Sequence, residues 1–311
     1  MNSLVHKTLA YTAYGMPIHS QLALPELGAP MALRTNSVPL RIVNATVDVP
    51  DDKVTPHGGY FFDETGSTFW WDQVGKFHVS TDGTIVRVER ADGVSDELLA
   101  FPLLGPVFSE VLRYRGFFVL HASAVSIDGI AVAVMADKGV GKSSSAAALL
   151  RGGAALLADD LVAVDADRGD IVPGFAQIKL SEGNLGHQLR GTDWVVRPHV
   201  HDQIDKVRVR VPSGTALKHA PLRRLYVLER GEGRCATFVR VPPEEALPLL
   251  LRFAYAPRFG DQALRGENAA RHFRAAVKLC SKAEVRRLQV SQGIEKLDHL
   301  IDAIRADLVA E

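Results

Sequence analysis

The sequence predicts a mixed α/β protein in which a β-rich N-terminal domain, residues 1–94, precedes an α/β domain, residues 95–311. Two observations support this class. The first part alternates apolar and polar residues in short segments between glycine turns, as strands do. The second part contains an apolar strand that leads into a glycine-rich loop and an alanine-rich helix. With 47% hydrophobic residues among 311, the chain has enough apolar side chains for a substantial core.

The N-terminal domain shows its strands most clearly at residues 40–47 and 76–80. No constellation of charged residues stands out there, so we expect this domain to have a recognition or scaffolding role. From residue 95 the pattern becomes helical. Ser95 is placed to cap a helix, which Pro102 and the Gly105-Pro106 pair are expected to kink or break.

The α/β domain alternates buried strands with helices. Its expected strands are residues 117–120, 123–127, 130–135, 154–158, 161–165, 206–211 and 223–229. Its expected helices are residues 142–150, 244–255, 268–280 and 293–309. The order strand, loop, helix, strand around the glycine-rich loop is the structural context that a phosphate-binding motif requires.

The glycine-rich loop, Ala136 to Ser143, carries the strongest chemical signal in the chain. Gly139 and Gly141 allow backbone N–H groups to turn inward and approach phosphate oxygens closely. Lys142 is placed to reach the β- and γ-phosphates and Ser143 to ligate Mg²⁺, while the following helix adds the positive end of its dipole. The alternative is a helix N-cap after a glycine turn that binds nothing, and the flanking strand and helix weigh against it.

Asp159 and Asp160 directly follow a predicted buried strand. In α/β sheets, ligand groups gather at the carboxyl ends of strands. One carboxylate there is suited to hold Mg²⁺, and the other to accept or orient the proton of an attacking hydroxyl. Two adjacent carboxylates also raise each other's pKa, which suits a base. The alternative is a solvated turn, which the preceding loop and strand disfavour.

Three further sets of residues have two interpretations each. His121 ends a strand and is either a partner of a phosphate or carboxylate, or a satisfied core histidine. Lys206, Arg208 and Arg210 share one strand face, which is more often a solvated face than a site for phosphate or an acidic peptide. Lys179 is within reach of a phosphate, although a surface lysine is the commoner case.

The composition narrows the class of protein further. The 36 basic residues balance the 36 acidic ones, so no global charge favours nucleic acid or an anionic membrane. The two cysteines cannot form a disulfide framework, and no metal-type cluster surrounds them. Residues 1–7 lack the apolar core of a signal peptide, and no apolar run reaches membrane-spanning length. We therefore expect a reduced, cytoplasmic enzyme that binds neither nucleic acid nor membrane.

Three motifs in this order resemble the catalytic domain of HPr kinase/phosphorylase: His121 to Val125, Asp137 to Ser143, and Leu157 to Asp160. The resemblance implies a P-loop, HPr-kinase-like fold and a serine kinase that uses ATP and Mg²⁺. It implies that Asp159 activates the acceptor hydroxyl, together with His121 and Lys142 as catalytic residues. The nucleotide-binding residues that it implies are Asp137, Lys138, Gly139, Val140, Gly141, Lys142, Ser143 and Ser144. The metal-binding residues that it implies are Ser143 and Asp160.

The chain departs from this family at two places. Ser144 stands where the bifunctional enzymes have glutamate, and the stretch Glu-Ile-Arg-Gly-Leu-Gly does not follow the aspartate pair. In this the chain resembles the HPr-kinase-related enzymes encoded with ribosomal peptides, notably the lasso-peptide kinases, whose opening is similar to residues 11–16 and 22–27. That resemblance implies that the acceptor is the C-terminal serine of a precursor peptide, and it is compatible with a homo-oligomer.

Two other functions stay open from the sequence. The chain could be a small-molecule hydroxyl kinase, or a regulatory module that binds a nucleotide without transferring its phosphate. The presence of both Asp159 and Lys142 argues against the regulatory module, because binding alone does not need a carboxylate at that place.

Overall fold

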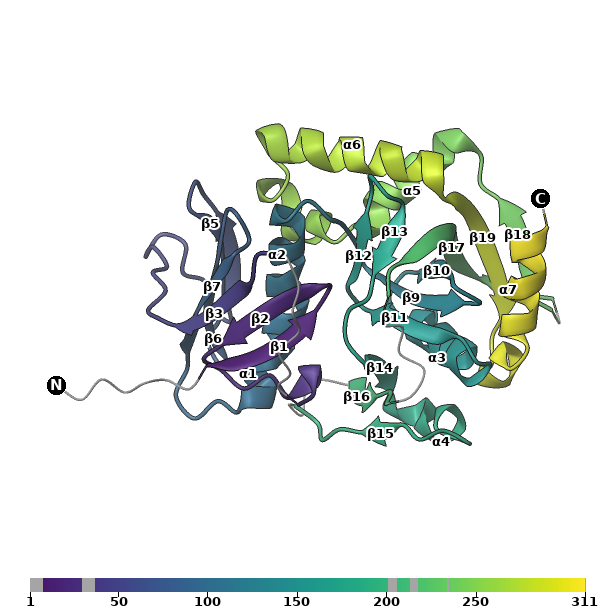
Figure 1. The fold of residues 1–311 in the computed structure, drawn as a ribbon, viewed down its shortest axis with the longest axis horizontal. Helices are drawn as coiled ribbons and strands as arrows, with labels where there is room; N and C mark the ends of the chain where they lie inside the picture. Colours follow the sequence, from purple (N-terminus) through teal and green to yellow (C-terminus); the bar gives the residue numbers. More distant parts are fainter. Residues whose placement is uncertain (1–7, 30–36, 201–205, 213–217, 234, 311) are drawn as a thin grey trace. The chain divides into compact units, whose positions relative to one another are not determined.

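The computed structural model describes residues 8–29, 37–200, 206–212, 218–233 and 235–310 (Figure 1). Residues 1–7, on which the expectation about a signal peptide rests, lie outside this part. The chain divides into two units. The first is Met1–Gly116 with Arg258–Ala263, and the second is Phe117–Pro257 with Leu264–Glu311. Among the described residues, no helix is both long enough and apolar enough to cross a membrane.

The first unit is built on a β-sheet, which confirms the expected β-rich N-terminal region. Within its described residues, seven strands lie in the order β1-β2-β3-β7-β6-β5-β4. The strands are β1 (Leu9–Ala13), β2 (Met16–Ser20), β3 (Leu40–Asn44), β4 (Gly59–Phe62), β5 (Gly66–Trp71), β6 (Gly75–Ser80) and β7 (Ile85–Arg90). β3 runs parallel to β2 and β7, and the other pairs are antiparallel.

Three short helical segments follow this sheet: α1 (Asp96–Pro102), the π-helix η2 (Leu103–Val107) and α2 (Phe108–Tyr114). The Ser95 hydroxyl accepts a hydrogen bond from the N–H of Leu98 at 3.2 Å, which confirms the predicted cap. The backbone at Gly105 is non-helical, as the Gly-Pro pair predicted. Glu110 is buried and accepts a hydrogen bond from Ser67 of the sheet. These helices therefore belong to the first unit, and the division falls after Gly116, whereas the sequence placed the domain boundary after residue 94.

The second unit holds a mixed sheet of nine strands among its described residues. Seven follow the order β11-β9-β10-β17-β13-β12-β8, and β19 pairs with β17 and β18. The strands are β8 (Phe118–Leu120), β9 (Ala122–Ile127), β10 (Ile130–Met135), β11 (Ala155–Asp159), β12 (Val162–Asp165), β13 (Asp170–Val172), β17 (Ala220–Gly231), β18 (Thr237–Arg240) and β19 (Glu284–Ser291). A separate small sheet has the order β14-β16-β15, with β14 (Gln177–Ser181), β15 (Val195–Val196) and β16 (Lys206–Arg210).

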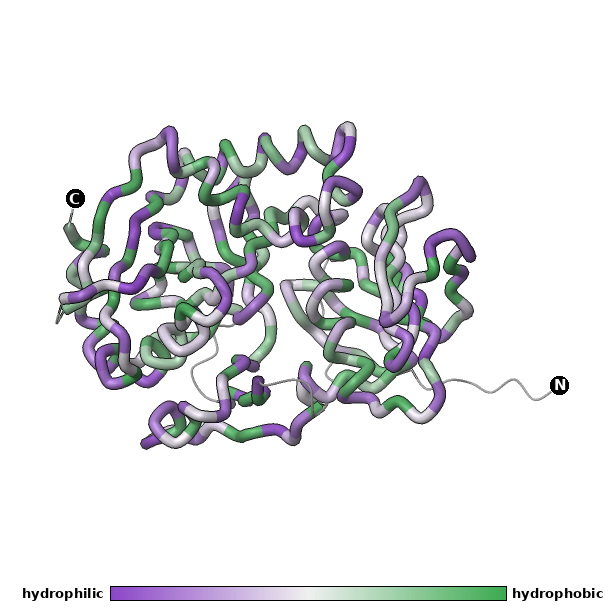
Figure 2. Tube along the Cα trace, turned by 180° about the vertical axis from the view of Figure 1, so that it is seen from behind, coloured by the Kyte–Doolittle hydropathy of each residue, from purple (hydrophilic) through white to green (hydrophobic). Residues whose placement is uncertain are grey.

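Among its described residues, the second unit has four helices close to the positions predicted from the sequence, and one short helix, α4, that was not predicted. They are α3 (Lys142–Arg151), α4 (Leu185–Gln188), α5 (Pro243–Phe253), α6 (Gly266–Lys282) and α7 (Leu300–Val309). α3 and α7 pack beside the strands, and Val132, Val134, Leu149 and Ile304 share one buried core. α6 alternates hydrophobic and hydrophilic residues along its length (Figure 2). The expected helix 293–309 is interrupted, because the 3-10 turn η5 (Ile294–Leu297) precedes α7.

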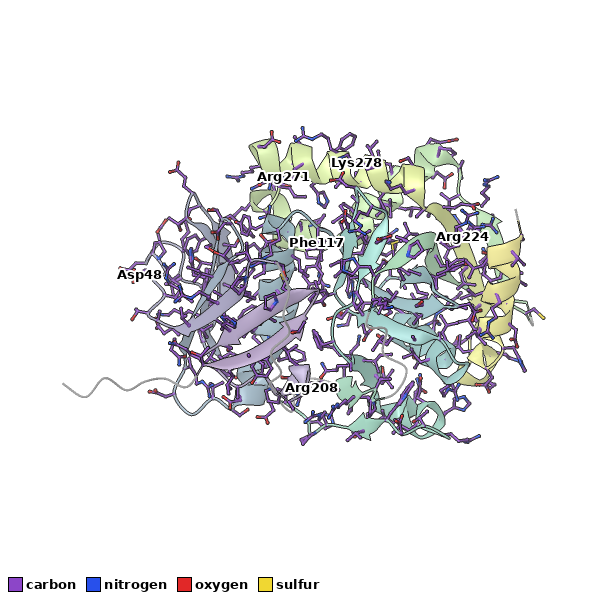
Figure 3. The ribbon with its side chains drawn as sticks, viewed as in Figure 1. Asp48, Phe117, Arg208, Arg224, Arg271 and Lys278 are labelled. Carbon is purple, nitrogen blue, oxygen red and sulfur yellow. The ribbon has the colours of Figure 1, made fainter. Side chains whose placement is uncertain are left out.

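A buried ionic network ties α7 to the sheet. Asp307 is 6% exposed, and its Oδ1 accepts from the Arg286 guanidinium at 2.5 Å while Oδ2 accepts from the Tyr226 hydroxyl at 2.7 Å. Burial and the Asp307 charge raise the pKa of Tyr226, so this phenol stays protonated as a donor. Arg224, which Figure 3 labels, lies with its Nε 3.7 Å from the same carboxylate. Glu284 is a second acceptor in this network, since it accepts from Arg286 Nε at 3.0 Å and lies 2.9 Å from Arg224 Nη1.

Replacing Asp307 by alanine is expected to lower the free energy of unfolding by about 1–3 kcal/mol, because it leaves the buried Tyr226 hydroxyl without its acceptor and removes one of the two carboxylates that pair with Arg286. Urea denaturation measures this. Asp302→Ala is the matched control, since Asp302 lies on the same helix but is exposed, and we expect a loss below about 1 kcal/mol there. Equal losses for the two variants would contradict a stabilising role of the network.

Candidate functional site

The topology of three strands assembles the candidate site. β9 pairs antiparallel with both β10 and β11, so β10 and β11 run in the same direction. Their carboxyl ends therefore lie beside the start of β9, where Met135 pairs with Ala122 and Asp159 pairs with Ser123. The prediction from sequence was based on parallel sheets. Here the antiparallel strand β9 lies between β10 and β11, and their carboxyl ends still meet at one edge of the sheet. The glycine-rich loop after β10 and the aspartate at the end of β11 are thus brought together.

The loop between β10 and α3 has the backbone that phosphate binding requires. Gly139 and Gly141 adopt φ values of +85° and +121°, which side chains with a Cβ rarely tolerate. A Cβ placed on Gly139 would meet no atom within 4 Å, so the conformation rather than the space demands glycine. α3 begins at Lys142 directly after the loop, and the first N–H groups of a helix have no partner within it. The loop and this helix end therefore fit a phosphate group.

Lys142, Ser143 and Asp159 lie together, as the sequence predicted, and all three are buried. The Ser143 hydroxyl donates to Asp159 Oδ1 at 3.2 Å, and Lys142 Nζ lies 3.6 Å from the same oxygen. Ser123, which sequence reasoning did not single out as a site residue, donates to this oxygen at 2.5 Å and accepts from Lys142 at 3.3 Å. The available signal was its position near the start of a mostly apolar strand, two residues after His121.

Asp160 has a basic side chain on each side. Its backbone is left-handed, with φ +73°. Oδ1 lies 3.1 Å from His121 Nε2, and Oδ2 accepts from Lys179 Nζ at 2.9 Å. Burial alone would raise the pKa of Asp160, but Lys179, then His121 and Lys142, hold it well below its usual value. The expected rise in pKa is therefore wrong for Asp160, whose carboxylate stays ionised near neutral pH.

Both His121, whose two interpretations the sequence left open, and Lys179, which is more commonly a surface lysine, lie at the site. The His121 N–H donates to the carbonyl of Phe253 at 2.9 Å, which fixes the backbone while the ring reaches Asp160. The Lys179 side chain is only 16% exposed, so it is not a surface lysine. The Lys179 N–H also donates to Asp159 Oδ2 at 2.8 Å. β14 therefore positions both carboxylates.

The basic residues of β16 share one face, as the alternation predicted. Lys179 pairs with Arg208 and Ser181 with Lys206 across the antiparallel pair, so their side chains lie on the same side of the small sheet. Lys206 and Arg210 are exposed, but Arg208 (Figure 3) is buried and donates to the carbonyl of Pro198 at 2.9 Å. The interpretation as a solvated face is therefore wrong for Arg208, the middle residue of the three.

The remaining loop residues lie farther from the carboxylates. Asp137 is exposed and forms an ion pair with Arg252 of α5 at 2.7 Å, and Lys138 is exposed. Val140 packs against the core, and Ser144 is half-buried in the first turn of α3. The predicted nucleotide-binding residues thus form two groups. Lys142 and Ser143 are buried next to Asp159, and the others lie along the loop.

The site suits a magnesium ion whose coordination is completed by the nucleotide phosphates and water. Within the described ranges, no three His, Cys, Asp or Glu side chains form a group that could hold a metal ion. Mg²⁺ in phosphoryl-transfer sites is usually held by one or two protein oxygens together with phosphate oxygens and water. The Ser143 hydroxyl, which lies 3.2 Å from Asp159 Oδ1 at the base of the loop, and the ionised carboxylate of the next residue, Asp160, supply two such oxygens. This donor set fits Mg²⁺ bound with a nucleotide.

Fold and site together define a mixed α/β protein with a glycine-rich loop between a strand and a helix, next to a pair of strand-end carboxylates. No protein-family model and no curated protein matches the chain. Among solved structures, it is similar to the HPr(Ser) kinase/phosphatase from Coxiella burnetii. The two are 11% identical, the match covers 62% of this chain and 99% of that chain, and the TM-score is 0.31. A likeness this distant carries no information about activity.

Proposed function

We propose that this protein is an ATP-dependent serine kinase whose acceptor is a peptide, and that the peptide is a lasso-peptide precursor with a C-terminal serine. The observation that carries the proposal is the buried group at the end of the glycine-rich loop, in which Lys142 and Ser143 both reach Asp159 Oδ1. This arrangement places a carboxylate that can accept a proton, Asp159, in contact with the residues that would bind the nucleotide phosphates. The motif resemblance to HPr-kinase-related enzymes supplies the peptide acceptor.

The residues have separate parts in the proposed reaction. The loop N–H groups and the start of α3 bind the nucleotide phosphates, and Lys142 exchanges its contact with Asp159 for the γ-phosphate. Ser143 and Asp160 would hold Mg²⁺, which when bound neutralises charge on the phosphates. Since Asp160 is kept ionised by Lys179 and His121, its negative charge is available throughout the neutral range.

Asp159 is the residue suited to take the proton. Its Oδ1 already accepts hydrogen bonds from the hydroxyls of Ser123 and Ser143, so it faces hydroxyl donors in this structure. In the transfer, a bond forms between the acceptor serine oxygen and the γ-phosphorus while the bond to the β–γ bridging oxygen breaks. The acceptor proton passes to Asp159, and ADP leaves with the bridging oxygen.

The proposal is tested by incubating the protein with Mg²⁺-ATP and a precursor-like peptide that ends in serine. We expect the peptide to gain the mass of one phosphate, and the same peptide with alanine in place of the serine to gain none. Mass spectrometry with fragmentation locates the phosphate. Transfer to free serine-like alcohols but to no peptide would favour the small-molecule kinase. Nucleotide binding without consumption, with or without acceptors, would favour the regulatory module.

A further inference from the structure

We propose that Lys206 is an acceptor-recognition residue that binds a carboxylate of the peptide next to its reacting serine. This inference rests on the proposed function. It predicts that the acceptor carries a negative charge beside the hydroxyl, either as its own C-terminal carboxylate or as an acidic side chain.

The first support is the position of the small sheet. The loop residues Lys142 and Ser143 approach Asp159 at Oδ1, whereas the backbone of β14 approaches the other oxygen, Oδ2, through the Lys179 N–H. β14 therefore borders the carboxylate from a side other than that of the phosphate loop. In phosphoryl transfer the attacking and leaving oxygens lie roughly in line, so the acceptor approaches opposite the nucleotide. We assign the β14 side to the acceptor.

The second support is where Lys206 lies on that sheet. Lys206 pairs with Ser181, and Lys179 pairs with Arg208, so Lys206 and Lys179 are diagonal neighbours on one face. Lys179 is tied to Asp160 at 2.9 Å, whereas Lys206 is exposed. Lys206 therefore has an accessible side chain next to Lys179, although its ammonium group is partly buried beside the carboxylate pair.

The third support is the balance of charge. Lys142 contacts Asp159 and Lys179 contacts Asp160, so each carboxylate already has one cation at contact distance. Partial burial of its ammonium group lowers the pKa of Lys206, with Lys142 and Lys179 lowering it and Asp159 and Asp160 raising it. Lys206 is therefore close enough to interact electrostatically with both carboxylates, and it is an additional cation at the site. An anion brought by the acceptor would complete the balance.

The test uses short synthetic peptides in two pairs. One pair ends in serine as a free acid or as an amide, and the other has an internal serine followed by aspartate or asparagine. We expect at least one pair to show a preference for the charged member of roughly tenfold or more in kcat/KM. The pair that shows it identifies the source of the carboxylate. Absence of any preference in both pairs would overturn the inference.

Three variants separate recognition from general effects of charge. Lys206→Ala is expected to abolish the preference by raising KM for the charged peptide while leaving KM for ATP unchanged. Lys206→Arg is expected to keep it. Arg210→Ala is the matched control, because Arg210 is exposed on the same strand face but pairs with Gln177 at the other end of the strand, and it is expected to keep the preference. An Lys206→Ala variant that loses ATP affinity and retains the preference would contradict the assignment.

Binding without turnover distinguishes this inference from the proposed function. Fluorescence anisotropy measures each labelled peptide on the full chain in the presence of a non-hydrolysable ATP analogue. If the charged peptide binds more tightly, and loses that advantage in Lys206→Ala, the carboxylate site stands even when no phosphate is transferred. If phosphate is transferred but neither peptide charge nor Lys206 affects binding, the proposed kinase function is supported and the proposed carboxylate site is wrong.

Discussion

Replacing Asp159 by asparagine is expected to slow phosphoryl transfer by about 10²–10⁴-fold, the usual contribution of a positioned proton acceptor. Asparagine keeps the shape of the side chain, and its carbonyl oxygen can still accept one of the hydrogen bonds that now reach the carboxylate from Ser123, Ser143 and the Lys179 N–H. The neutral amide cannot take a proton from the acceptor. Lys142 also loses its counter-charge, which leaves it available to the nucleotide phosphates.

Single-turnover measurements with ATP and peptide give the rate for each bound complex, and calorimetric titration gives the nucleotide affinity. We expect the rate to fall much more than the affinity. Asp165→Asn is the matched control, because Asp165 ends the next strand, β12, and its carboxylate caps its own turn at the N–H groups of residues 167 and 168. Collapse of nucleotide affinity in Asp159→Asn, with an unchanged rate for each bound complex, would contradict the role of base.

The loop and the strand-end carboxylates could be predicted from sequence because each depends on local patterns. The apolar run of β10, the glycines and the alanine-rich helix lie within residues 130–151. The meeting of that loop with Asp159 needs only that β10 and β11 end at the same edge of the sheet. The antiparallel β9 between them preserves this condition. The hydrophobic periodicity, the glycine-rich motif and the direction of the strands were therefore sufficient to predict this part of the site.

The other half of the site could not be predicted in the same way, because it depends on pairing between distant segments. Lys179 and Lys206 become neighbours only through the register of β14 with β16. The pKa of Asp160 also depends on long-range packing, because Lys179 of β14 reaches Asp160, which directly follows β11. The sequence suggested His121 as a partner of a phosphate or carboxylate, but only the fold brings both Lys179 and His121 to Asp160, where they reverse the direction of its pKa shift.

The limits of the first unit depend on long-range packing as well. Phe259 comes from the segment Arg258–Ala263, late in the chain, yet its ring lies 5.2 Å from that of Phe69 and 5.4 Å from that of Tyr60. Aromatic pairs at such spacing stabilise a core beyond the area they bury. No periodicity in the sequence near residue 259 shows where this ring packs, so the place of this segment in the first unit could not be predicted.

Replacing Lys142 by methionine is expected to reduce phosphoryl transfer on the order of a thousandfold or more, because the developing charge on the transferred group loses its nearest cation. Methionine keeps much of the apolar stem that is buried at the start of α3. Asp159 retains its hydrogen bonds from Ser123, Ser143 and the Lys179 N–H, so the carboxylate is not left without donors. We therefore expect the variant to fold.

Thermal unfolding followed by circular dichroism checks the fold, and the peptide assay gives the rate. Lys278→Ala is the control, because Lys278 is an exposed cation on α6 (Figure 3) that pairs with Asp167 on the surface, and it is expected to transfer phosphate normally. Normal turnover in a folded Lys142→Met variant would exclude the loop lysine from catalysis. Since a module that only binds nucleotide has no transfer to lose, a large loss of rate in this variant, measured at saturating ATP, also separates the kinase from that alternative.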